Sequence, residues 1–251
     1  MQQMFLGLGA VAEKTYIDDI FSIDVFTGNG TNNGAAGTQK TITNGIDLAT
    51  HGGLLWGKER ARPQAHNLFD SERGISEANS PKISSNEADG QNNRAKSITS
   101  FNTNGYSLGS SWYGNPAHPI CYWSFRKAPG FFDVVTWTGN GSSRTIAHSL
   151  GSVPGMIMVK NTSSTIDWTV WHRGTAQANA TNTLTLNSSG AAATNNTYFD
   201  NGSTPPTSTN FTVHTSNRVN ANGDNYVAYV FAGGESTAAT ARSVYFDGND
   251  E

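Results

Sequence analysis

The feature that most constrains the fold of this 251-residue chain is an internal repeat. A series of short landmarks occurs twice in the same order, offset by roughly 100 residues, and such self-similarity is the signature of a repeated structural unit. The paired landmarks are 24–30 with 133–141, 41–42 with 145–146, 53–58 with 155–160, 67–74 with 169–174, 106–108 with 211–213, and 121–125 with 227–231. Composition alone does not produce this order, so the sequence predicts one unit present in two copies.

Within each copy, the residue pattern is that of β-strands. Residues 54–56 and 156–159 are continuously apolar, which predicts strands buried on both faces. Residues 168–173 alternate in the manner of a strand with one exposed face, and 226–231 have the composition of a core strand. Apolar residues nowhere keep helical spacing over more than two turns. We therefore expect an all-β fold of two tandem, mutually similar, jelly-roll-like β-sandwich domains with long polar loops.

The expected boundaries follow from the repeat. The parts are an apolar N-terminal docking segment at 1–15, a first β-sandwich unit at 16–128, a second at 129–234, and a linker or the start of a further domain at 235–251. The long polar loops are 75–97 and 175–209, which occupy the same place in each unit and should extend from the same edge. The junction at 126–132 is short enough to hold the two units in a fixed orientation.

Two smaller patterns also recur. The Gly-Asn-Gly segments at 28–30 and 139–141 predict tight hairpin turns, because Gly and Asn accept positive φ. Arg73 and Arg173 occupy the same corner of each unit. An arginine that bonds loop carbonyls is the more ordinary interpretation there, and a contact with another subunit is the alternative.

Charge and cysteine content exclude several classes of function. The net charge is −3 and the 16 basic residues are scattered, so the chain lacks the basic patch of a nucleic-acid-binding protein. The single cysteine, Cys121, excludes an intrachain disulfide and a cysteine-based zinc site. The six histidines have no metal-binding spacing, and no nucleophile with a base stands out. We expect no enzyme activity, no cofactor and no metal.

The N-terminal stretch 4–12 is apolar but much shorter than the roughly 20 residues that span a bilayer. No basic region precedes it, so neither a signal peptide nor membrane insertion is expected. Two interpretations stay open: a buried first strand, or an apolar peptide that attaches to a neighbouring subunit of a larger assembly. In the second interpretation the attachment residues are Met4, Phe5, Leu6 and Leu8.

Trp112 and Tyr113 are the candidate ligand-binding residues. Both lie in a stretch rich in Gly, Asn and Pro. Large aromatic side chains in such a loop stack on sugar rings or fill the pocket of a protein partner. The alternative is structural, with the two rings closing one end of a sandwich.

Several stretches of the chain resemble an uncharacterised module. They are YIDDIFS at 16–22, WSFRKAPGFFDVV at 123–135, TGNG at 138–141, RTIAH at 144–148 and LGSVPGMI at 150–157. Together they are similar to a module that recurs in tail-fibre-like and other virion proteins of marine bacteriophages, including podoviruses of cyanobacteria. The resemblance covers about residues 4–234.

The last residues carry a second resemblance. Residues 243–250 look like the opening strand of a laminin-G/concanavalin-like domain, which often follows the module in such phage proteins. The chain is accordingly expected to be either a fragment or a form in which a short tail has been kept.

The resemblance to the phage module implies location and role, and it supplies no catalytic or binding residues. It implies a structural virion protein on the exterior of the tail or capsid, namely a tail fibre or tail appendage that attaches by its N-terminal part and contributes to host adsorption. The implied partners are other copies of the chain, as a homotrimer, phage tail or capsid proteins, and host surface glycan. The alternatives are a capsid decoration protein, a carbohydrate-binding module that reads host surface polysaccharide, and a depolymerising enzyme.

Overall fold

The computed structural model describes five stretches of the chain, residues 15–30, 39–111, 113–175, 182–199 and 204–234. The candidate residues that lie outside these stretches are Met4, Phe5, Leu6, Leu8 and Trp112. The same holds for residues 1–14 of the expected docking segment and for 235–251, the expected linker or further domain.

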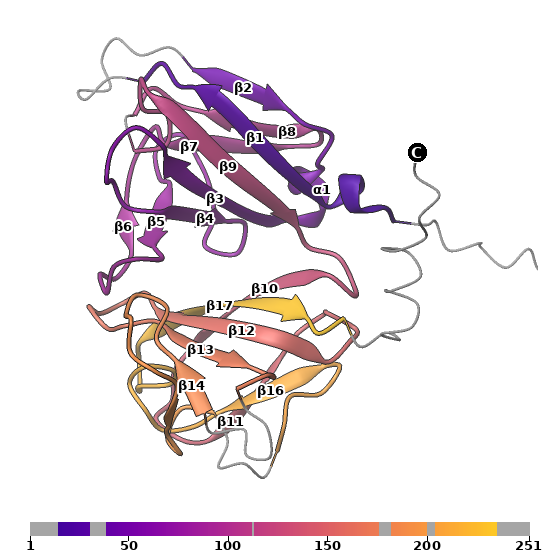
Figure 1. Ribbon diagram of the computed structural model, residues 1–251, viewed down its shortest axis with the longest axis vertical. Helices are drawn as coiled ribbons and strands as arrows, with labels where there is room; N and C mark the ends of the chain where they lie inside the picture. The colour runs from indigo at the N-terminus through magenta and orange to yellow at the C-terminus, as the bar shows by residue number, and fades with distance from the viewer. Residues whose placement is uncertain (1–14, 31–38, 112, 176–181, 200–203, 235–251) are drawn as a thin grey trace, which may run out of the picture.

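The described chain is almost entirely antiparallel β-structure, which confirms the predicted all-β sandwich fold (Figure 1). Its helices are short, since η1 is Ile17–Asp19 and α1 is Leu48–His51. No helix in the described stretches is long and apolar enough to cross a membrane.

The first half of the chain forms two sheets. The larger one, here called the first major sheet, has the strand order β1-β9-β3-β4-β5-β6. Its strands are β1 (Phe21–Thr27), β9 (Pro119–Arg126), β3 (Gly53–Glu59), β4 (Asn67–Asp70), β5 (Pro81–Ser84) and β6 (Asn92–Asn93). The smaller one, the first cover sheet, has the order β2-β8-β7, with β2 (Lys40–Thr43), β8 (Gly105–Leu108) and β7 (Ile98–Asn102).

The second half has the same arrangement. The second major sheet has the order β10-β17-β12-β13-β14-β15, with β10 (Phe132–Thr138), β17 (Asn225–Ala232), β12 (Pro154–Asn161), β13 (Thr169–His172), β14 (Asn182–Leu184) and β15 (Ala193–Thr194). The second cover sheet pairs β11 (Arg144–Ala147) with β16 (Asn210–Val213). In each major sheet the first strand of that half of the chain, β1 or β10, lies at the edge of the sheet and pairs with the last strand of the same half, β9 or β17. The origin of this likeness in a duplication stays a prediction from the sequence.

Three apolar cores separate the sheets into four layers. The first core lies between the first cover and major sheets and includes Phe69, Tyr106 and Tyr122. An equivalent core in the second half includes Trp171 and Phe211. The third, the central core, lies between the two major sheets, because side chains of both pack together in it; examples from each sheet are Leu54, Leu68, Phe132, Trp168 and Tyr229.

Burial on both faces of the major sheets explains one success and one failure of the strand predictions. The apolar runs 54–56 and 156–159 lie in β3 and β12, where most side chains are buried, as predicted. The half-exposed pattern expected for 168–173 is wrong for 168–171, because Trp168, Thr169, Val170 and Trp171 are all buried, whereas His172 and Arg173 are exposed. Trp171 faces the second core and Trp168 the central core, so this stretch packs on both faces.

The central core contains a buried ion pair that joins the two halves. Arg73 Nε donates to Asp70 Oδ2 at 2.6 Å, and the Tyr229 hydroxyl from the second half donates to the same oxygen at 2.7 Å. Arg73 also donates to the Leu68 carbonyl oxygen at 3.1 Å. Arg73 therefore bonds a backbone carbonyl, as expected of a structural arginine, although that carbonyl belongs to strand β4 and not to a loop.

The two Gly-Asn-Gly segments are not hairpin turns, so that prediction is wrong. Segment 28–30 follows β1, and 139–141 connects β10 to β11, which lies in a different sheet. A buried asparagine, Asn115 in the first half and Asn220 in the second, accepts a hydrogen bond from the central N–H of the segment, at 3.0 and 3.1 Å. The small residues here allow two loops to approach closely, which the sequence does not distinguish from a tight reversal.

The insertions 75–97 and 175–209 are not loops throughout. The first contains β5 and β6 and the second contains β14 and β15, which extend the same edge of each major sheet. All four residues of β5 are buried, although they include a lysine and a serine. Ser84 is covered by the second half, since the Trp168 indole donates to its carbonyl oxygen at 2.8 Å. The expectation of a long polar loop fails at β5 because tertiary contacts bury a segment that has little apolar character.

Candidate functional site

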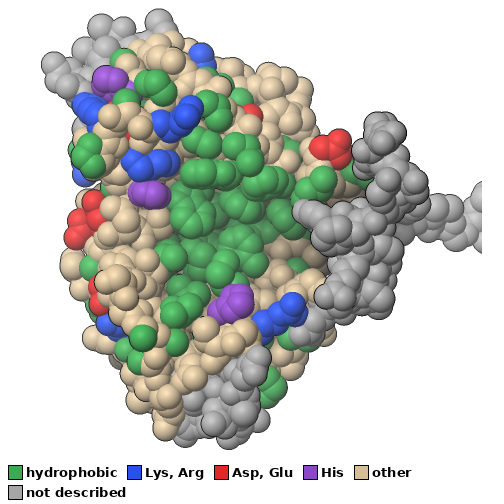
Figure 2. Space-filling view, viewed as in Figure 1, with side chains coloured by type: hydrophobic (Ala, Val, Ile, Leu, Met, Phe, Trp, Pro, Cys, Tyr) green, Lys and Arg blue, Asp and Glu red, His purple; other side chains and the backbone are tan. Residues whose placement is uncertain are grey.

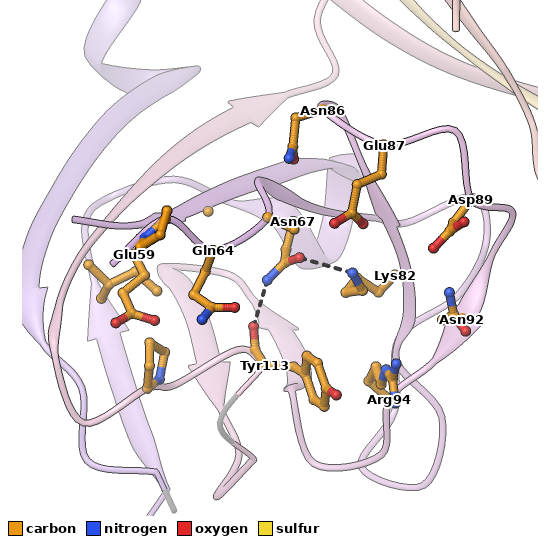
Figure 3. Close-up of a pocket in the computed structure, with 15 residues that line it drawn as sticks. Glu59, Gln64, Asn67, Lys82, Asn86, Glu87, Asp89, Asn92, Arg94 and Tyr113 are labelled. Atoms are coloured by element: carbon orange, nitrogen blue, oxygen red, sulfur yellow. Dashed lines mark hydrogen bonds between the residues drawn. The ribbon is translucent and has the colours of Figure 1, made fainter. Parts of the chain in front are cut away.

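A polar cleft of about 340 Å³ opens on the first half of the chain (Figure 3). It is formed by the ends of β3 and β4, by β5 and β6, and by the loop that precedes β9. Its polar side chains come from separate segments and gather around one space; they are Glu59, Gln64, Asn67, Lys82, Asn86, Glu87, Asp89, Asn92 and Arg94. Tyr113 supplies the aromatic ring.

Tyr113 is held from several sides. Its carbonyl oxygen accepts a hydrogen bond from Asn67 Nδ2 at 3.0 Å. The Arg94 guanidinium carbon lies 4.1 Å from the centroid of its ring, a cation–π contact. A Cβ at the next residue, Gly114, would lie 2.7 Å from the Ser97 backbone, so only glycine allows the loop to pack this closely. Tyr113 as a whole residue is still 36% exposed, which leaves it accessible to a ligand.

Lys82 lies in the cleft although its side chain is buried. Its Nζ donates to Ser84 Oγ at 2.7 Å and to Asn67 Oδ1 at 3.2 Å. Burial lowers the pKa of Lys82 below its ordinary value, while the nearby Glu87 and Asp89 act in the opposite direction. The amine thus adds positive charge beside two carboxylates, and it positions the Asn67 amide that holds Tyr113.

The carboxylate of Glu59 is bound by the protein itself. Arg62 donates to both of its oxygens, at 2.5 and 3.1 Å. Lys58 Nζ donates to the backbone carbonyl oxygens of Glu59 and Arg62, at 2.5 and 3.0 Å. Because its charge is paired and its side chain is 5% exposed, Glu59 forms part of the wall of the cleft.

The opposite rim of the cleft depends on the second half of the chain. Glu87 and Asp89 belong to a loop whose Ala88 carbonyl oxygen accepts a hydrogen bond from Lys160 Nζ at 3.0 Å. In the same loop, the Gln91 N–H donates to the Thr162 carbonyl oxygen at 2.8 Å. The stacking of the two halves therefore shapes a site whose lining residues all belong to the first.

The chemistry of the cleft is that of hydrogen bonding to a neutral polar ligand. Amide groups supply both donors and acceptors, carboxylates supply acceptors, and Lys82 and Arg94 supply donors. Within the described stretches, no group of three or more His, Cys, Asp or Glu side chains is arranged to hold a metal ion. The Cys121 thiol is buried, and this burial raises its pKa, which disfavours the reactive thiolate.

The structure places one of the predicted site residues in the cleft. Tyr113 lines it, whereas Trp112 and the four N-terminal candidates lie outside the described residues. Sequence reasoning missed Asn67, Lys82 and Arg94. The only signal that pointed to Lys82 and Arg94 was the density of Asn, Glu, Lys and Arg in the insertion 75–97, which is also the composition of a solvated loop, and no signal pointed to Asn67.

Comparison with known proteins assigns the chain to a family. A model described as Domain of unknown function (DUF7483) matches residues 18–242, and the chain therefore belongs to this family. No curated protein and no solved structure matches the chain.

Proposed function

We propose that this DUF7483 protein is a non-enzymatic, structural and adhesive component of a bacteriophage particle, a tail fibre or tail appendage, and that its first half binds host surface polysaccharide in the polar cleft. The observation that carries the adhesive part is the cleft itself, in which an exposed aromatic ring stands among amide, carboxylate and cationic side chains. The virion part rests on the resemblance of the sequence to phage appendage modules.

A glycan fits this combination for two reasons. Sugar rings present hydroxyls that accept and donate hydrogen bonds, and the amide side chains of Gln64 and Asn86 do the same. Sugars also carry patches of C–H groups that pack on aromatic faces, for which Tyr113 is available. The volume of 340 Å³ lies near the lower end of the range of about 300–1,000 Å³ for small-ligand sites, which suits a short stretch of a polysaccharide.

The fold also suits an extracellular structural role. Apolar cores lie on both faces of each major sheet, except that β1 is exposed on one face, and the central core joins the halves without a flexible linker. Proteases cleave segments that unfold locally, and strands packed in this way have few such openings. We therefore expect the protein to resist proteolysis. The proposal includes no cofactor and no metal, association with tail or capsid proteins, and self-association of the chain.

The adhesive part is tested by glycan binding. We expect the intact protein to bind oligosaccharides on an array of host surface glycans. Tyr113→Ala should weaken the binding of the best oligosaccharide by about tenfold or more in titration calorimetry, because this removes the aromatic contact. Tyr16→Ala is the matched control, since Tyr16 is an exposed tyrosine outside the cleft. Equal affinities for the parent and the Tyr113→Ala protein would remove the cleft from the proposal.

The location is tested separately. A cryo-EM map of the particle should show this fold in a tail appendage, and density on the capsid shell would instead assign a decoration role. Release of reducing ends from host polysaccharide by the purified protein would contradict the non-enzymatic role.

A further inference from the structure

Strand β1 has one covered face and one apolar face without a cover. Phe26 stacks on Tyr122 at 6.2 Å, and the Asp24 carboxylate accepts a hydrogen bond from the Tyr106 hydroxyl at 3.1 Å, so both face the first core. Side chains alternate along a strand, so Ile23 and Val25 lie on the other face. They are 55% and 57% exposed.

This apolar face continues the central core. Ile23 pairs with Trp123 of β9, and Trp123 pairs with Trp56 of β3, whose side chain packs against the central core. Two residue pairs along, the Phe21 ring lies 5.0 Å from that of Phe125, which also packs against the central core. We call Phe21, Ile23, Val25 and Trp123 the β1 face. Figure 2 shows apolar side chains gathered in one continuous area across the middle of this side of the molecule.

The corresponding strand of the second half, β10, has no such face among its residues, all of which the structure describes. Val134 of β10 pairs with Tyr229, as Ile23 of β1 pairs with Trp123, and β10 is likewise the edge strand of its major sheet. Val134 is 1% exposed, because it lies within the central core. The exposed apolar edge is therefore a property of β1 and not of the fold in general.

The edge of β1 is also open to another strand. Within the described stretches β1 pairs only with β9, so its other side presents a row of backbone N–H and C=O groups. Natural edge strands are often protected by lysines, prolines, β-bulges or charged side chains that point inward. β1 has no lysine, no proline and no bulge in its register with β9, and the carboxylate of its one charged residue, Asp24, is bound by the Tyr106 hydroxyl. Such an edge is suited to strand addition.

We propose that the apolar segment 4–12 of a second copy of this chain adds to β1 as a further strand. The segment is uncharged, and its nine residues extend to about 30 Å, against about 23 Å for the seven of β1. Met4, Leu6 and Leu8 occupy every second position of the segment, with Phe5 and Gly7 between them. On one face of an added strand they would therefore extend the apolar row that ends at Ile23 and Val25. This proposal goes beyond glycan binding, because it concerns assembly.

The chain before β1 favours a second copy over the same copy. η1 is stabilised by the Tyr16 N–H, which donates to Asp19 Oδ2 at 2.8 Å, and by the Ile20 N–H, which donates to the Ile17 carbonyl oxygen at 3.1 Å. The described chain enters η1 from the side away from β1 (Figure 1). To pair with β1 of its own chain, the segment would have to reverse direction between residue 12 and the described chain, which begins at residue 15. Only Glu13 and Lys14 lie there, and these are not the residues that form tight hairpin turns.

Cysteine cross-linking tests the contact directly. In a background with Cys121→Ser, one chain carries Leu8→Cys and another, with a tag of different mass, carries Val25→Cys. After mixing and mild oxidation, non-reducing gel electrophoresis should show the heterodimer of the two masses. Leu186→Cys in place of Val25→Cys is the control, because Leu186 is an exposed apolar residue of the second half. A heterodimer yield no greater than that of the control would overturn the proposal, and so would a cross-link formed within single chains that carry both cysteines.

Self-association provides the second measurement. Analytical ultracentrifugation of the full chain should show oligomers whose dissociation constant rises at least tenfold in Val25→Asp and on deletion of residues 1–12. Leu186→Asp should leave it unchanged. A full chain that stays monomeric, or a Val25→Asp protein that associates like the parent, would refute the idea. Glycan binding in the Tyr113 cleft should persist in the dissociated variants, so the outcomes for assembly and for adhesion are independent.

Discussion

The stacking of the two halves predicts a large effect from the loss of one hydroxyl. Tyr229 is fully buried, and its hydroxyl donates to Asp70 at 2.7 Å and accepts from Arg73 at 3.3 Å. Tyr229→Phe removes both contacts and keeps the ring that packs in the central core. Hydrogen bonds to charged groups contribute about 1.5–3 kcal/mol, so we expect the free energy of unfolding to fall by about 2 kcal/mol.

Asp70→Ala should be more damaging. It leaves the Arg73 guanidinium buried without a counter-charge, and breaking a buried ion pair in this way costs about 3–5 kcal/mol. In the double variant the two effects should fall short of their sum by more than about 0.5 kcal/mol, because Tyr229 and Asp70 share one bond.

Urea unfolding followed by tryptophan fluorescence measures these differences. Tyr16→Phe is the control, because Tyr16 is 62% exposed. A Tyr229→Phe protein whose unfolding free energy matches that of the control would show that the ion pair does not join the halves as described. Strict additivity in the double variant would equally refute the shared network.

Three further predictions follow from local geometry and can be checked by the same unfolding assay. Gly28→Ala and Gly139→Ala should each cost about 1–3 kcal/mol, because a Cβ at either position would lie 2.0 Å from a carbonyl oxygen, whereas Gly190→Ala, with 3.5 Å of clearance, should be neutral. Burial lowers the pKa of His148 below its ordinary 6.5, so the unfolded state binds more protons than the folded state just below that pH. The free energy of unfolding should therefore fall as the pH drops through 6.5. In His148→Gln this dependence on pH should be weaker. Burial lowers the pKa of Lys160 to about 8, so between about pH 8 and 10.5 the unfolded state binds more protons than the folded state. The free energy of unfolding should therefore rise over this pH range. A Lys160→Met protein that shows the same rise would contradict this prediction.

The candidate site was only partly predictable from sequence. Tyr113 could be identified because a large aromatic in a Gly-, Asn- and Pro-rich stretch is unusual for a solvated loop. Lys82 and Arg94 could not, because the polar insertion that carries them has the composition of many exposed loops. Their placement depends on β5 and on the loop between β5 and β6, which hydrogen bonds from the second half hold in place.

The amino-acid sequence by itself determined the class of structure and the positions of several strands along the chain. Runs of apolar residues and their spacing are local properties, so they predict the buried strands β3, β12 and β17 without knowledge of their neighbours. Only the tertiary structure decided which faces these strands bury. The stacking of the two major sheets removed the solvent face expected for β13, buried β5, and left Ile23 and Val25 uncovered on β1. Such outcomes depend on contacts between residues far apart in the chain, and the residue pattern of a single strand does not predict those contacts.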